Sequence, residues 1–406
     1  MWTSKPTEQQ VANWLGIGGL MGCLLLTSGC HTGLAASEAS ARPTTHSPSL
    51  VIAATASRAE WRLQVPSAVH EELLNAALKS QKADGATVAL VVAGQPTQRF
   101  DLTPMRGRQV EHNTTLRKRK AEAIVENFEH LITDSVAGVA GLDLLGVLDR
   151  AGREGRHARI AVLSSGVSTA PPFDIRKFGW PDGEQSVAAS LKSRNELPQY
   201  LAGDDIRFYY LADAAGTQPR LTIPLRKGII HAYLDICRSA GGICHVEDDA
   251  ASNSKALATL RVAVVPLPKV TSVPQKRRCE RTLRVPSILL FAPNSAALDE
   301  GADVALQPIV DEVVNGRGTT VITEISGHTA DVDAGDGVGL SQRRARAVAR
   351  RLEQLGVPTA LIKRVVGRGE SRPVARNRKP DGSISPSAAL NRRVEISVST
   401  ANCPSK

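Results

Sequence analysis

Charged side chains gather near the C-terminus around the start of a predicted helix, where they could bind a small zwitterion. Asp331, Asp333 and Asp336 stand in a loop of small residues, and Arg343 and Arg344 follow it. Positive side chains in the first helical turn oppose the helix dipole, unless an anion binds there and meets free amide hydrogens and a guanidinium together. A loop aspartate would then suit an ammonium group. The pattern predicts a site for an α-amino acid.

A short strand and a helix must position these residues. Val321–Ile325 is rich in strand-forming residues and leads into Gly327-His328-Thr329. Ser341 predicts the N-cap of a helix that ends at Gly356. Its core-facing stripe is Ala345, Val348, Leu352 and Leu355, and Arg346 is expected to point to solvent.

Three segments in this order resemble the peptidoglycan-binding domain of the OmpA family. They are Gly327-His328-Thr329, Leu340-Ser341-Gln342-Arg343-Arg344-Ala345 and Asn391-Arg392-Arg393-Val394-Glu395-Ile396. The resemblance covers residues 283–400, about the length of one domain. It implies a non-enzymatic domain that binds the diaminopimelate end of a peptidoglycan stem peptide.

The resemblance also implies a role for single residues. Arg344 matches the arginine that binds the ligand carboxylate, and Thr329 belongs to the same site. The family's aspartate follows the Gly-x-Thr directly, whereas here Ala330 does. Asp331 is therefore the first candidate for the ammonium partner, and Asp333 and Asp336 are further candidates. The plainer alternatives are a solvated acidic loop and, for Arg344, a surface salt bridge.

The rest of this domain is predicted to follow a βαβαββ order. Ile288–Phe291 is expected to be a buried strand, and Asn294–Leu298 a turn into a helix. Val365–Val374 matches the family's glycine-rich strand exit, and Val394–Val398 closes the sheet. Gly367-x-Gly369 lacks the third glycine and the following helix of a nucleotide site.

The N-terminus indicates export. Val11–Leu26 is apolar but short for a membrane span, so residues 1–29 are predicted to be a signal peptide. The following Cys30 resembles the lipidated cysteine of a bacterial lipobox; a retained membrane helix is the alternative. Residues 30–58 are predicted to be a disordered tether because they are rich in Ala, Ser, Thr and Pro. The protein should lie at the cell envelope, anchored to a membrane and facing the wall, and its composition suggests an actinobacterial source.

Residues 59–268, the middle domain, alternate predicted strands and helices. This indicates a Rossmann-like, helix-covered, mostly parallel sheet. Val162–Thr169 resembles, weakly, a strand end of von Willebrand factor A domains. The predicted strands are Thr87–Val92, Arg159–Leu163 and Ile206–Leu211, and the helices are Thr115–Ile132, Val187–Arg194 and Leu225–Ala240. Residues 269–282 are expected to be a linker and 401–406 a tail.

No metal, cofactor or catalytic site is predicted. The segment taken to follow the first strand, Ala93–Pro96, lacks the carboxylate and hydroxyl groups that hold a divalent cation in von Willebrand factor A domains. Ser164 and Ser165 lack a Gly-x-Ser-x-Gly turn, so they are expected to be turn residues rather than nucleophiles.

Four cysteines follow Cys30, and an exported chain would oxidise them. Cys237 and Cys244 flank Gly241-Gly242 and could form a local bridge. Cys279 and Cys403 bracket the C-terminal domain and could form a second, although the sequence alone does not fix the connectivity. That bridge would be worth about 4–5 kcal/mol in the chain-entropy model.

The net charge of +10 suggests polyanionic partners. Nucleic acid is not expected, because the basic residues are not interleaved with aromatic ones and the chain is exported. Arg117–Lys120 and Lys276–Arg278 could contact wall polymers or lipid headgroups, or be plain solvated faces.

The sequence thus predicts a lipid-anchored protein that ties a membrane to peptidoglycan. In the alternative, wall binding only positions the middle domain, which acts as a scaffold for a protein partner. A wall hydrolase is a third class, but no catalytic arrangement supports it.

We expect the mature protein to begin at a diacylated Cys30, because the cysteine follows an apolar core and small residues. Intact-mass spectrometry of the membrane fraction would show the lipid on the N-terminal peptide. An unmodified Cys30 in a chain that keeps residues 1–29 would contradict this.

Overall fold

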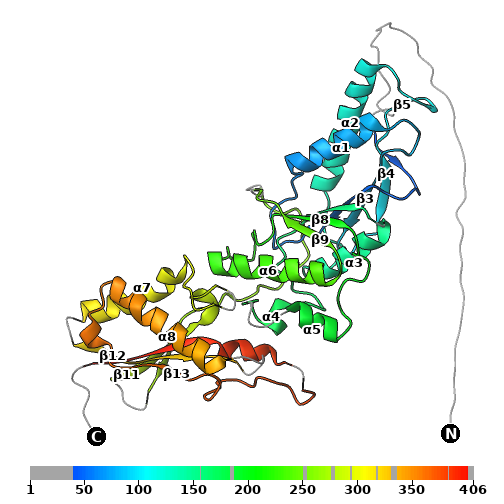
Figure 1. The fold of residues 1–406 in the computed structure, drawn as a ribbon. Coiled ribbons are helices and arrows are strands. Elements are labelled where there is room, and N and C mark those ends of the chain that lie inside the picture. The colour runs from blue at the N-terminus through cyan, green and yellow to red at the C-terminus, as the bar shows by residue number, and fades with distance from the viewer. Residues whose placement is uncertain are drawn as a thin grey trace, which may run out of the picture. The chain divides into compact units, whose positions relative to one another are not determined.

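The computed structural model describes residues 40–400 (Figure 1). Not described within this range are residues 156, 183–186, 250–253, 276–278, 293–294, 317–318, 331–335 and 383. The predicted signal peptide, Cys30 and Cys403 lie outside the described residues. In the part of the chain that the structure describes, no helix is long and apolar enough to cross a membrane.

The sheet of the middle domain has seven strands in the spatial order β1-β4-β3-β2-β7-β8-β9. Strands β3, β2, β7, β8 and β9 are parallel to their neighbours, whereas β4 and β1 join one edge in antiparallel fashion. A mostly parallel sheet was expected, and its assignment to the von Willebrand factor A class stays a prediction. The strands are β1 (Arg42–Pro43), β2 (Leu50–Ala54), β3 (Thr87–Val92), β4 (Gln98–Asp101), β7 (Arg159–Leu163), β8 (Asp205–Tyr209) and β9 (Ile243–Val246), and β5 (Met105–Arg106) with β6 (Gln109–Val110) forms a separate ribbon.

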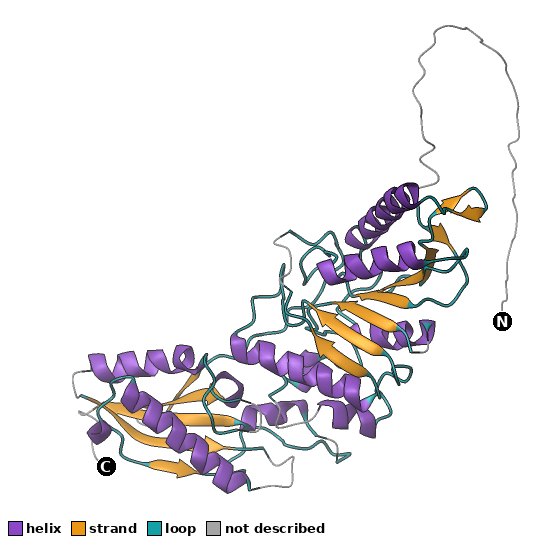
Figure 2. Cartoon of the chain, turned by 45° about the horizontal axis from the view of Figure 1, so that its top comes forward, coloured by secondary structure: helices purple, strands orange, loops and turns teal. Residues whose placement is uncertain are grey.

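Helices cover both faces of this sheet (Figure 2). Leu50 and Ile52 of β2 face one helix layer, while Val51 and Ala53 face the other, so the whole strand is buried. Such burial on both faces explains why the strand is apolar throughout rather than alternating. The first layer holds α1 (Ser67–Lys79) and α2 (Thr114–Thr133); the second holds α3 (Leu144–Glu154), α4 (Ile175–Phe178), α5 (Val187–Ser193) and α6 (Ile223–Ser239).

The structure corrects the predicted tether, because β1 and β2 lie within residues 30–58. The run Leu50-Val51-Ile52-Ala53-Ala54 is too short to change the composition of a window rich in Ala, Ser, Thr and Pro. It nevertheless pairs with β3 on one side and β7 on the other. The middle domain therefore begins before residue 59, and β2 is its first parallel strand.

The cysteine predictions fare differently. The Cys237–Cys244 disulfide is confirmed and joins the end of α6 to β9. Thr400 N–H donates to the Cys279 carbonyl at 3.2 Å, which brings the end of the last strand beside Cys279. Pairing with Cys403 stays a prediction, since Cys403 is not among the described residues.

Two residues of the basic run on α2 bond to backbone carbonyls of the middle domain. Arg117 is 8% exposed and donates to the carbonyl oxygens of Leu78 at 2.9 Å and Ala77 at 3.1 Å, and also to that of Ser80. These carbonyls lie at the C-terminal end of α1, where no helical amide reaches them. Lys120 donates to the Met105 carbonyl at 2.8 Å. The run Arg117–Lys120 is therefore not simply a surface for polyanions.

The C-terminal domain has a five-stranded sheet in the order β10-β11-β14-β12-β13. From β11 onward its elements follow the predicted βαβαββ order, and the apolar faces of both long helices pack on the sheet. The strands are β10 (Thr271–Pro274), β11 (Glu280–Pro286), β12 (Thr320–His328), β13 (Val365–Gly367) and β14 (Arg393–Thr400); the helices are α7 (Ala302–Asn315) and α8 (Gly337–Gln354), with 3-10 turns η2 (Ser287–Leu289), η3 (Thr359–Leu361) and η4 (Pro386–Asn391).

Two predictions for this domain are wrong. Ile288–Phe291 is not a strand: its first half lies in η2, Leu290 follows in a turn, and Phe291 makes an isolated bridge to Leu298. A short apolar run does not distinguish these structures by periodicity. The expected linker 269–282 instead contains β10 and the start of β11, which pair in antiparallel fashion.

We expect Arg117→Met to lower the free energy of unfolding by about 2–3 kcal/mol, because it leaves buried carbonyls at the end of α1 without donors. Arg119→Met changes an exposed neighbour in the same helix and should cost less than about 0.5 kcal/mol. Urea denaturation followed by circular dichroism measures both. Equal stability of the two variants would contradict the capping role of Arg117.

Candidate functional site

Two motifs of the predicted site, around Gly327 and around Ser341, meet where the ends of β12 and β13 approach α8. A Cβ atom on Gly327 would lie 2.1 Å from the carbonyl oxygen of Ser341, and one on Gly367 would lie 2.5 Å from the amide nitrogen of Gln342. Only glycine fits at such distances. The two glycines let the helix lie directly against the strand ends.

Hydrogen bonds fix this contact. The Ser341 hydroxyl accepts from Gly369 N–H at 2.9 Å and donates to the Val338 carbonyl at 2.8 Å. Gln342 Oε1 accepts from Gly367 N–H at 2.6 Å. Side chains from α8 thus satisfy backbone groups of the segment that leaves β13.

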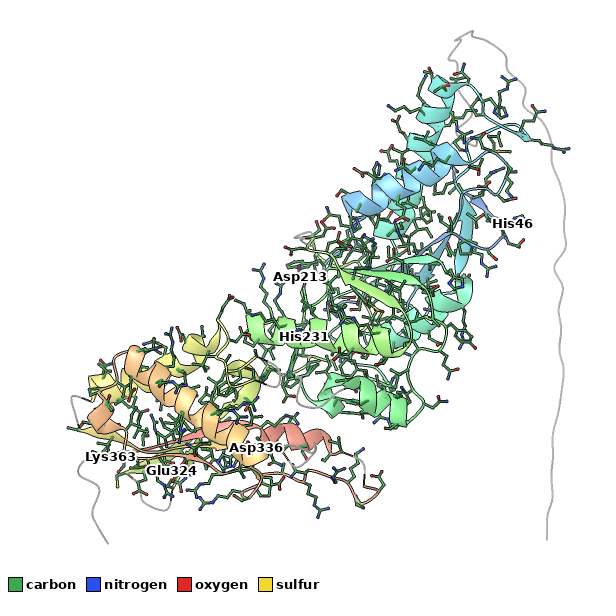
Figure 3. All side chains as sticks on the ribbon, viewed as in Figure 1. His46, Asp213, His231, Glu324, Asp336 and Lys363 are labelled. Atoms are coloured by element: carbon green, nitrogen blue, oxygen red, sulfur yellow. A yellow bond between two sulfur atoms is a disulfide. The ribbon has the colours of Figure 1, made fainter. Side chains whose placement is uncertain are left out.

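Helix α8 begins earlier than predicted. Its N-cap is Asp336, which accepts from Gly339 N–H at 2.7 Å and lies 3.5 Å from Arg343 (Figure 3). Ser341 is fully buried within the helix rather than capping it. The longer helix arises because Asp336-Gly337-Val338-Gly339 can itself form a capped first turn, with a carboxylate favoured at the positive end of the dipole.

Arg344 consequently lies about two turns inside α8 rather than in its first turn. It is 1% exposed, and its Nε donates to the Ser295 carbonyl at 2.9 Å. Its guanidinium carbon lies 4.9 Å from the centre of the Phe291 ring. The alternative of a surface salt bridge is therefore wrong for Arg344. Arg346, by contrast, is exposed as predicted.

The other predicted site residues have different outcomes. Thr329 is 6% exposed, and its amide donates to the Gly369 carbonyl at 3.0 Å, so it lies beside the segment that leaves β13. Asp336 already caps α8, which makes it a poorer candidate for binding an ammonium group. Asp331 and Asp333 lie outside the described residues.

His328 is a buried member of this region that the sequence did not single out for a role. It is 1% exposed at the end of β12, with Nε2 3.2 Å from Ser326 Oγ and 3.7 Å from Glu395. Burial lowers the pKa of His328 to about 4, and nearby Arg393 acts in the same direction against the opposing effect of Glu395. His328 is therefore neutral at physiological pH.

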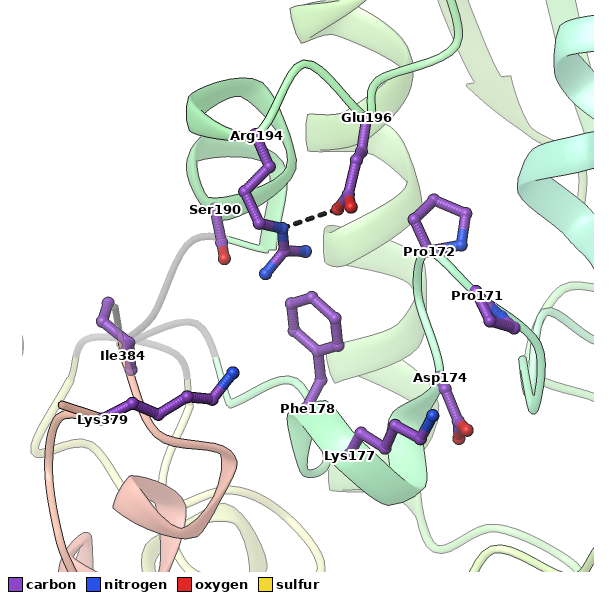
Figure 4. Close-up of a pocket in the computed structure, with 10 residues that line it drawn as sticks. All are labelled: Pro171, Pro172, Asp174, Lys177, Phe178, Ser190, Arg194, Glu196, Lys379 and Ile384. Atoms are coloured by element: carbon purple, nitrogen blue, oxygen red, sulfur yellow. Dashed lines mark hydrogen bonds and ion pairs between the residues drawn. The ribbon is translucent and has the colours of Figure 1, made fainter. Parts of the chain in front are cut away.

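A hollow lies beside α4 and α5 of the middle domain and is also lined by Lys379 and Ile384 of the C-terminal domain (Figure 4). Here Arg194 pairs with Glu196 at 2.6 Å and lies 4.9 Å from the centre of the Phe178 ring. Asp174 caps α4 and pairs with Arg176 at 2.7 Å. The hollow brings together none of the residues of the predicted site, so it is a weaker candidate. Among the described residues, no group of three His, Cys, Asp or Glu is placed to hold a metal ion.

The family comparison falls on the C-terminal domain. Residues 290–385 match the model of the OmpA family. One curated relative, the photosystem I P700 chlorophyll a apoprotein A2 of Gloeobacter violaceus, is 36% identical over 124 residues. The match covers 30% of this chain and 14% of the relative, so the chain spans only a small part of that protein's length.

Solved structures resemble about a third of the chain. A MotB-like protein from Desulfovibrio vulgaris is 31% identical, with 32% of this chain and 79% of that chain covered and a TM-score of 0.28. The cell wall anchor of the T6SS from Pseudomonas aeruginosa is 26% identical, with 32% of this chain and 88% of that chain covered and a TM-score of 0.27. The peptidoglycan-associated lipoprotein from Burkholderia pseudomallei is 26% identical, with 27% of this chain and 87% of that chain covered and a TM-score of 0.23.

We expect the buried His328 to make this domain less stable in acid. Between pH 6.5 and about 4, histidine in the unfolded chain binds a proton that His328 in the folded chain does not. The free energy of unfolding should therefore fall as pH falls through this window. Urea denaturation at a series of pH values would show a shallower pH dependence for His328→Gln than for the parent. Parallel curves would contradict a buried, neutral His328.

Proposed function

We propose, from the premise that residues 290–385 form an OmpA family domain, that this chain is a non-enzymatic envelope protein that binds peptidoglycan through residues 283–400. One observation carries the proposal. Arg344, the arginine of the family's Leu-Ser-x-x-Arg-Ala motif, is held at a fixed position by the Ser295 carbonyl and the Phe291 ring. A guanidinium held in this way is suited to a carboxylate, because little conformational entropy is lost on binding.

The proposed ligand is the α-amino-acid end of diaminopimelate in a stem peptide. Its carboxylate would contact Arg344, and its ammonium group would contact Asp331, which stands two residues after Thr329. Asp333 remains a second candidate for the ammonium partner. The early start of α8 changes one detail of the predicted site. The amides of the first helical turn lie about two turns from Arg344, so in our proposal Arg344, and not the helix terminus, makes the main contact with the ligand carboxylate.

The N-terminal segment supports a tethering role. If Cys30 carries lipid, the chain between it and β1 is a short spacer, and the folded part stays close to the membrane that holds it. A lipid at one end and a wall-binding domain at the other would connect the two layers of the envelope.

A second candidate function is that of an envelope scaffold. In this case peptidoglycan binding only positions the middle domain, and that domain binds a protein partner. The observation that favours it is the size of the middle domain, which has its own doubly covered sheet and its own core and is larger than an anchor alone requires.

We expect Arg344→Ala to reduce co-sedimentation of the full chain with purified sacculi by at least about tenfold in affinity, because a charge-assisted pair is worth about 1.5–3 kcal/mol. Arg346→Ala is the matched control: it removes an exposed arginine from the same helix and should bind like the parent. Since Arg344 is buried, circular dichroism must first show that the variant is folded, and Arg344→Lys serves as a milder form.

The aspartates give the finer test. Asp331→Ala should lose binding, while Asp336→Ala should mainly lower helix stability. Loss of binding in Asp333→Ala with normal binding in Asp331→Ala would reassign the ammonium partner. Normal binding by a folded Arg344→Ala would overturn the proposed site.

A further inference from the structure

The positive charge of the chain is concentrated in one segment of the C-terminal domain. Residues 337–379 contain twelve Lys and Arg residues and two Glu residues, which is a net charge of +10. The whole chain of 406 residues has the same net charge of +10, so the residues outside this segment are together neutral. The segment comprises α8, η3, β13 and the start of the loop that leaves β13.

This segment forms one edge of the domain. Strand β13 is the last strand of the sheet, next to β12. Helix α8 returns the chain from the end of β12 to the start of the parallel strand β13, so it runs antiparallel to both. Gln342 of α8 accepts from Gly367 N–H at 2.6 Å, which places this side of the helix beside β13. Arg346 and Arg350 follow Gln342 on the same side at intervals of four residues, and both are exposed.

The loop after β13 continues this edge and is fixed by its backbone. The Arg372 carbonyl accepts from the Arg393 guanidinium at 3.0 Å. Val374 N–H donates to the side-chain oxygen of Asn391 at 2.7 Å. The side chains of Arg372 and Arg376 nevertheless stay exposed. Their positions are therefore set by the fold, although their charged groups are in solvent.

Part of the charge of the segment is paired within the domain. Arg351 of α8 pairs with Asp303 at 2.7 Å. Arg364 and Arg368 both pair with Glu324 of β12, at 3.5 Å and 2.8 Å (Figure 3). Because one glutamate serves two arginines, this edge has fewer acids than bases.

Four exposed arginines have no such partner. Within the part of the chain that the structure describes, no carboxylate pairs with Arg346, Arg350, Arg372 or Arg376. These four residues form the arginine edge. Like charges four residues apart on a helix repel each other, as Arg346 and Arg350 do. The arrangement therefore costs stability by itself, and an anion bound between the two side chains would reverse that cost.

The composition of the segment favours phosphate as the anion. Ten of its twelve cations are Arg, whose planar fork matches two phosphate oxygens at once. The segment contains no Phe, Tyr or Trp, so it offers no ring on which nucleic-acid bases could stack. The large apolar side chains that it exposes are those of Val338 and Val374, which are too small to anchor it in a lipid interface. The arginine edge therefore suits a chain of phosphates better than a base-bearing strand or a bilayer.

We propose that the arginine edge binds a linear phosphate polymer of the cell envelope, of the poly(glycerol phosphate) type. The four side chains follow the sheet edge along α8 and the loop after β13, and a linear polymer can follow the same path with successive phosphates. Binding of several phosphates releases counterions, so the affinity falls as salt rises. The arginine edge is separate from the proposed peptidoglycan site, since Arg344 is buried, and its test does not depend on wall binding.

The double variant Arg350→Gln, Arg376→Gln in the full chain tests the arginine edge. Fluorescence anisotropy measures binding to labelled poly(glycerol phosphate) at several salt concentrations. Loss of two phosphate contacts should weaken binding about tenfold near physiological salt and should reduce the slope of log K against log salt by about one to two. If circular dichroism shows that this variant does not fold, Arg346→Gln with Arg372→Gln replaces it.

The control variant is Arg108→Gln, Arg119→Gln. It removes two exposed charges from the middle domain, so it changes the net charge equally without touching the arginine edge. It should bind the polymer within about twofold of the parent, because exposed charges further away than about 10 Å are screened at this salt concentration. Equal weakening by the two double variants would show that only net charge matters, and would overturn the assignment to this edge.

Two further ligands decide the chemistry of the partner. Hyaluronate is a linear polymer whose charges are carboxylates, and vesicles of phosphatidylglycerol present phosphates on a bilayer. The parent should bind poly(glycerol phosphate) about tenfold more tightly than hyaluronate at equal concentration of charge. Equal affinity for hyaluronate would overturn the assignment to phosphate. Binding to the vesicles without binding to the polymer would overturn the assignment to a polymer, and binding to neither would overturn the surface itself.

The arginine edge and the peptidoglycan site should fail independently. A folded Arg344→Ala variant should keep its affinity for poly(glycerol phosphate). The Arg350→Gln, Arg376→Gln variant should still co-sediment with sacculi from which phosphate polymers have been removed. Loss of polymer binding in folded Arg344→Ala would show that one site takes both ligands, and would overturn a separate arginine edge.

Discussion

The geometry of the C-terminal domain depends on one close contact, that between the first turns of α8 and the ends of β12 and β13. Gly327 and Gly367 permit it, because any side chain at either position would collide with helix backbone. Ser341 and Gln342 then make it specific by bonding to amides that leave β13. The direction of Arg344 follows from this contact, since the same helical segment carries it.

Three buried charges among the described residues bond to backbone groups. Arg117 donates to carbonyls at the end of α1, Arg344 to the Ser295 carbonyl, and Glu60 accepts from amides of Ser57 and Ser165. A charge held in this way is costly to disturb, because its partners cannot move without the backbone.

The sequence predicted elements well where pattern and length agreed. The amphipathic helix at Thr115–Ile132 and the apolar strand Arg159–Leu163 are present with nearly the expected bounds. Prediction failed where two signals competed. The strand Leu50–Ala54 was not predicted because the window around it is rich in Ala, Ser, Thr and Pro. Ser341 was predicted to be the N-cap of the helix, whereas Asp336 caps it five residues earlier. The motif singled out Arg344 for a binding role, which stays a prediction, and its burial against Phe291 depends on tertiary packing that no local pattern encodes.

Because β2 was missed, the cluster of hydrogen bonds around Glu60 was not predicted from the sequence. The loop taken to follow the first strand was Ala93–Pro96, whereas the first parallel strand leads into Thr55–Glu60. Ser164 and Ser165 were expected to be turn residues, and in the structure both are buried after β7 and lie within hydrogen-bond distance of Glu60. These contacts depend on the pairing of β7 with β2, which places the two serines beside a segment about a hundred residues earlier in the chain.

Polar groups gather at the carboxyl ends of two pairs of neighbouring parallel strands, β12 with β13 and β2 with β7. Strand ends of this kind leave amide hydrogens without a partner in the sheet, which suits them to negatively charged groups. Near the first pair, the positive charge of Arg344 is held inside the domain by the Ser295 carbonyl and the Phe291 ring. At the second pair, neutral donors hold the carboxylate of Glu60, which the protein itself supplies and which is shielded from water.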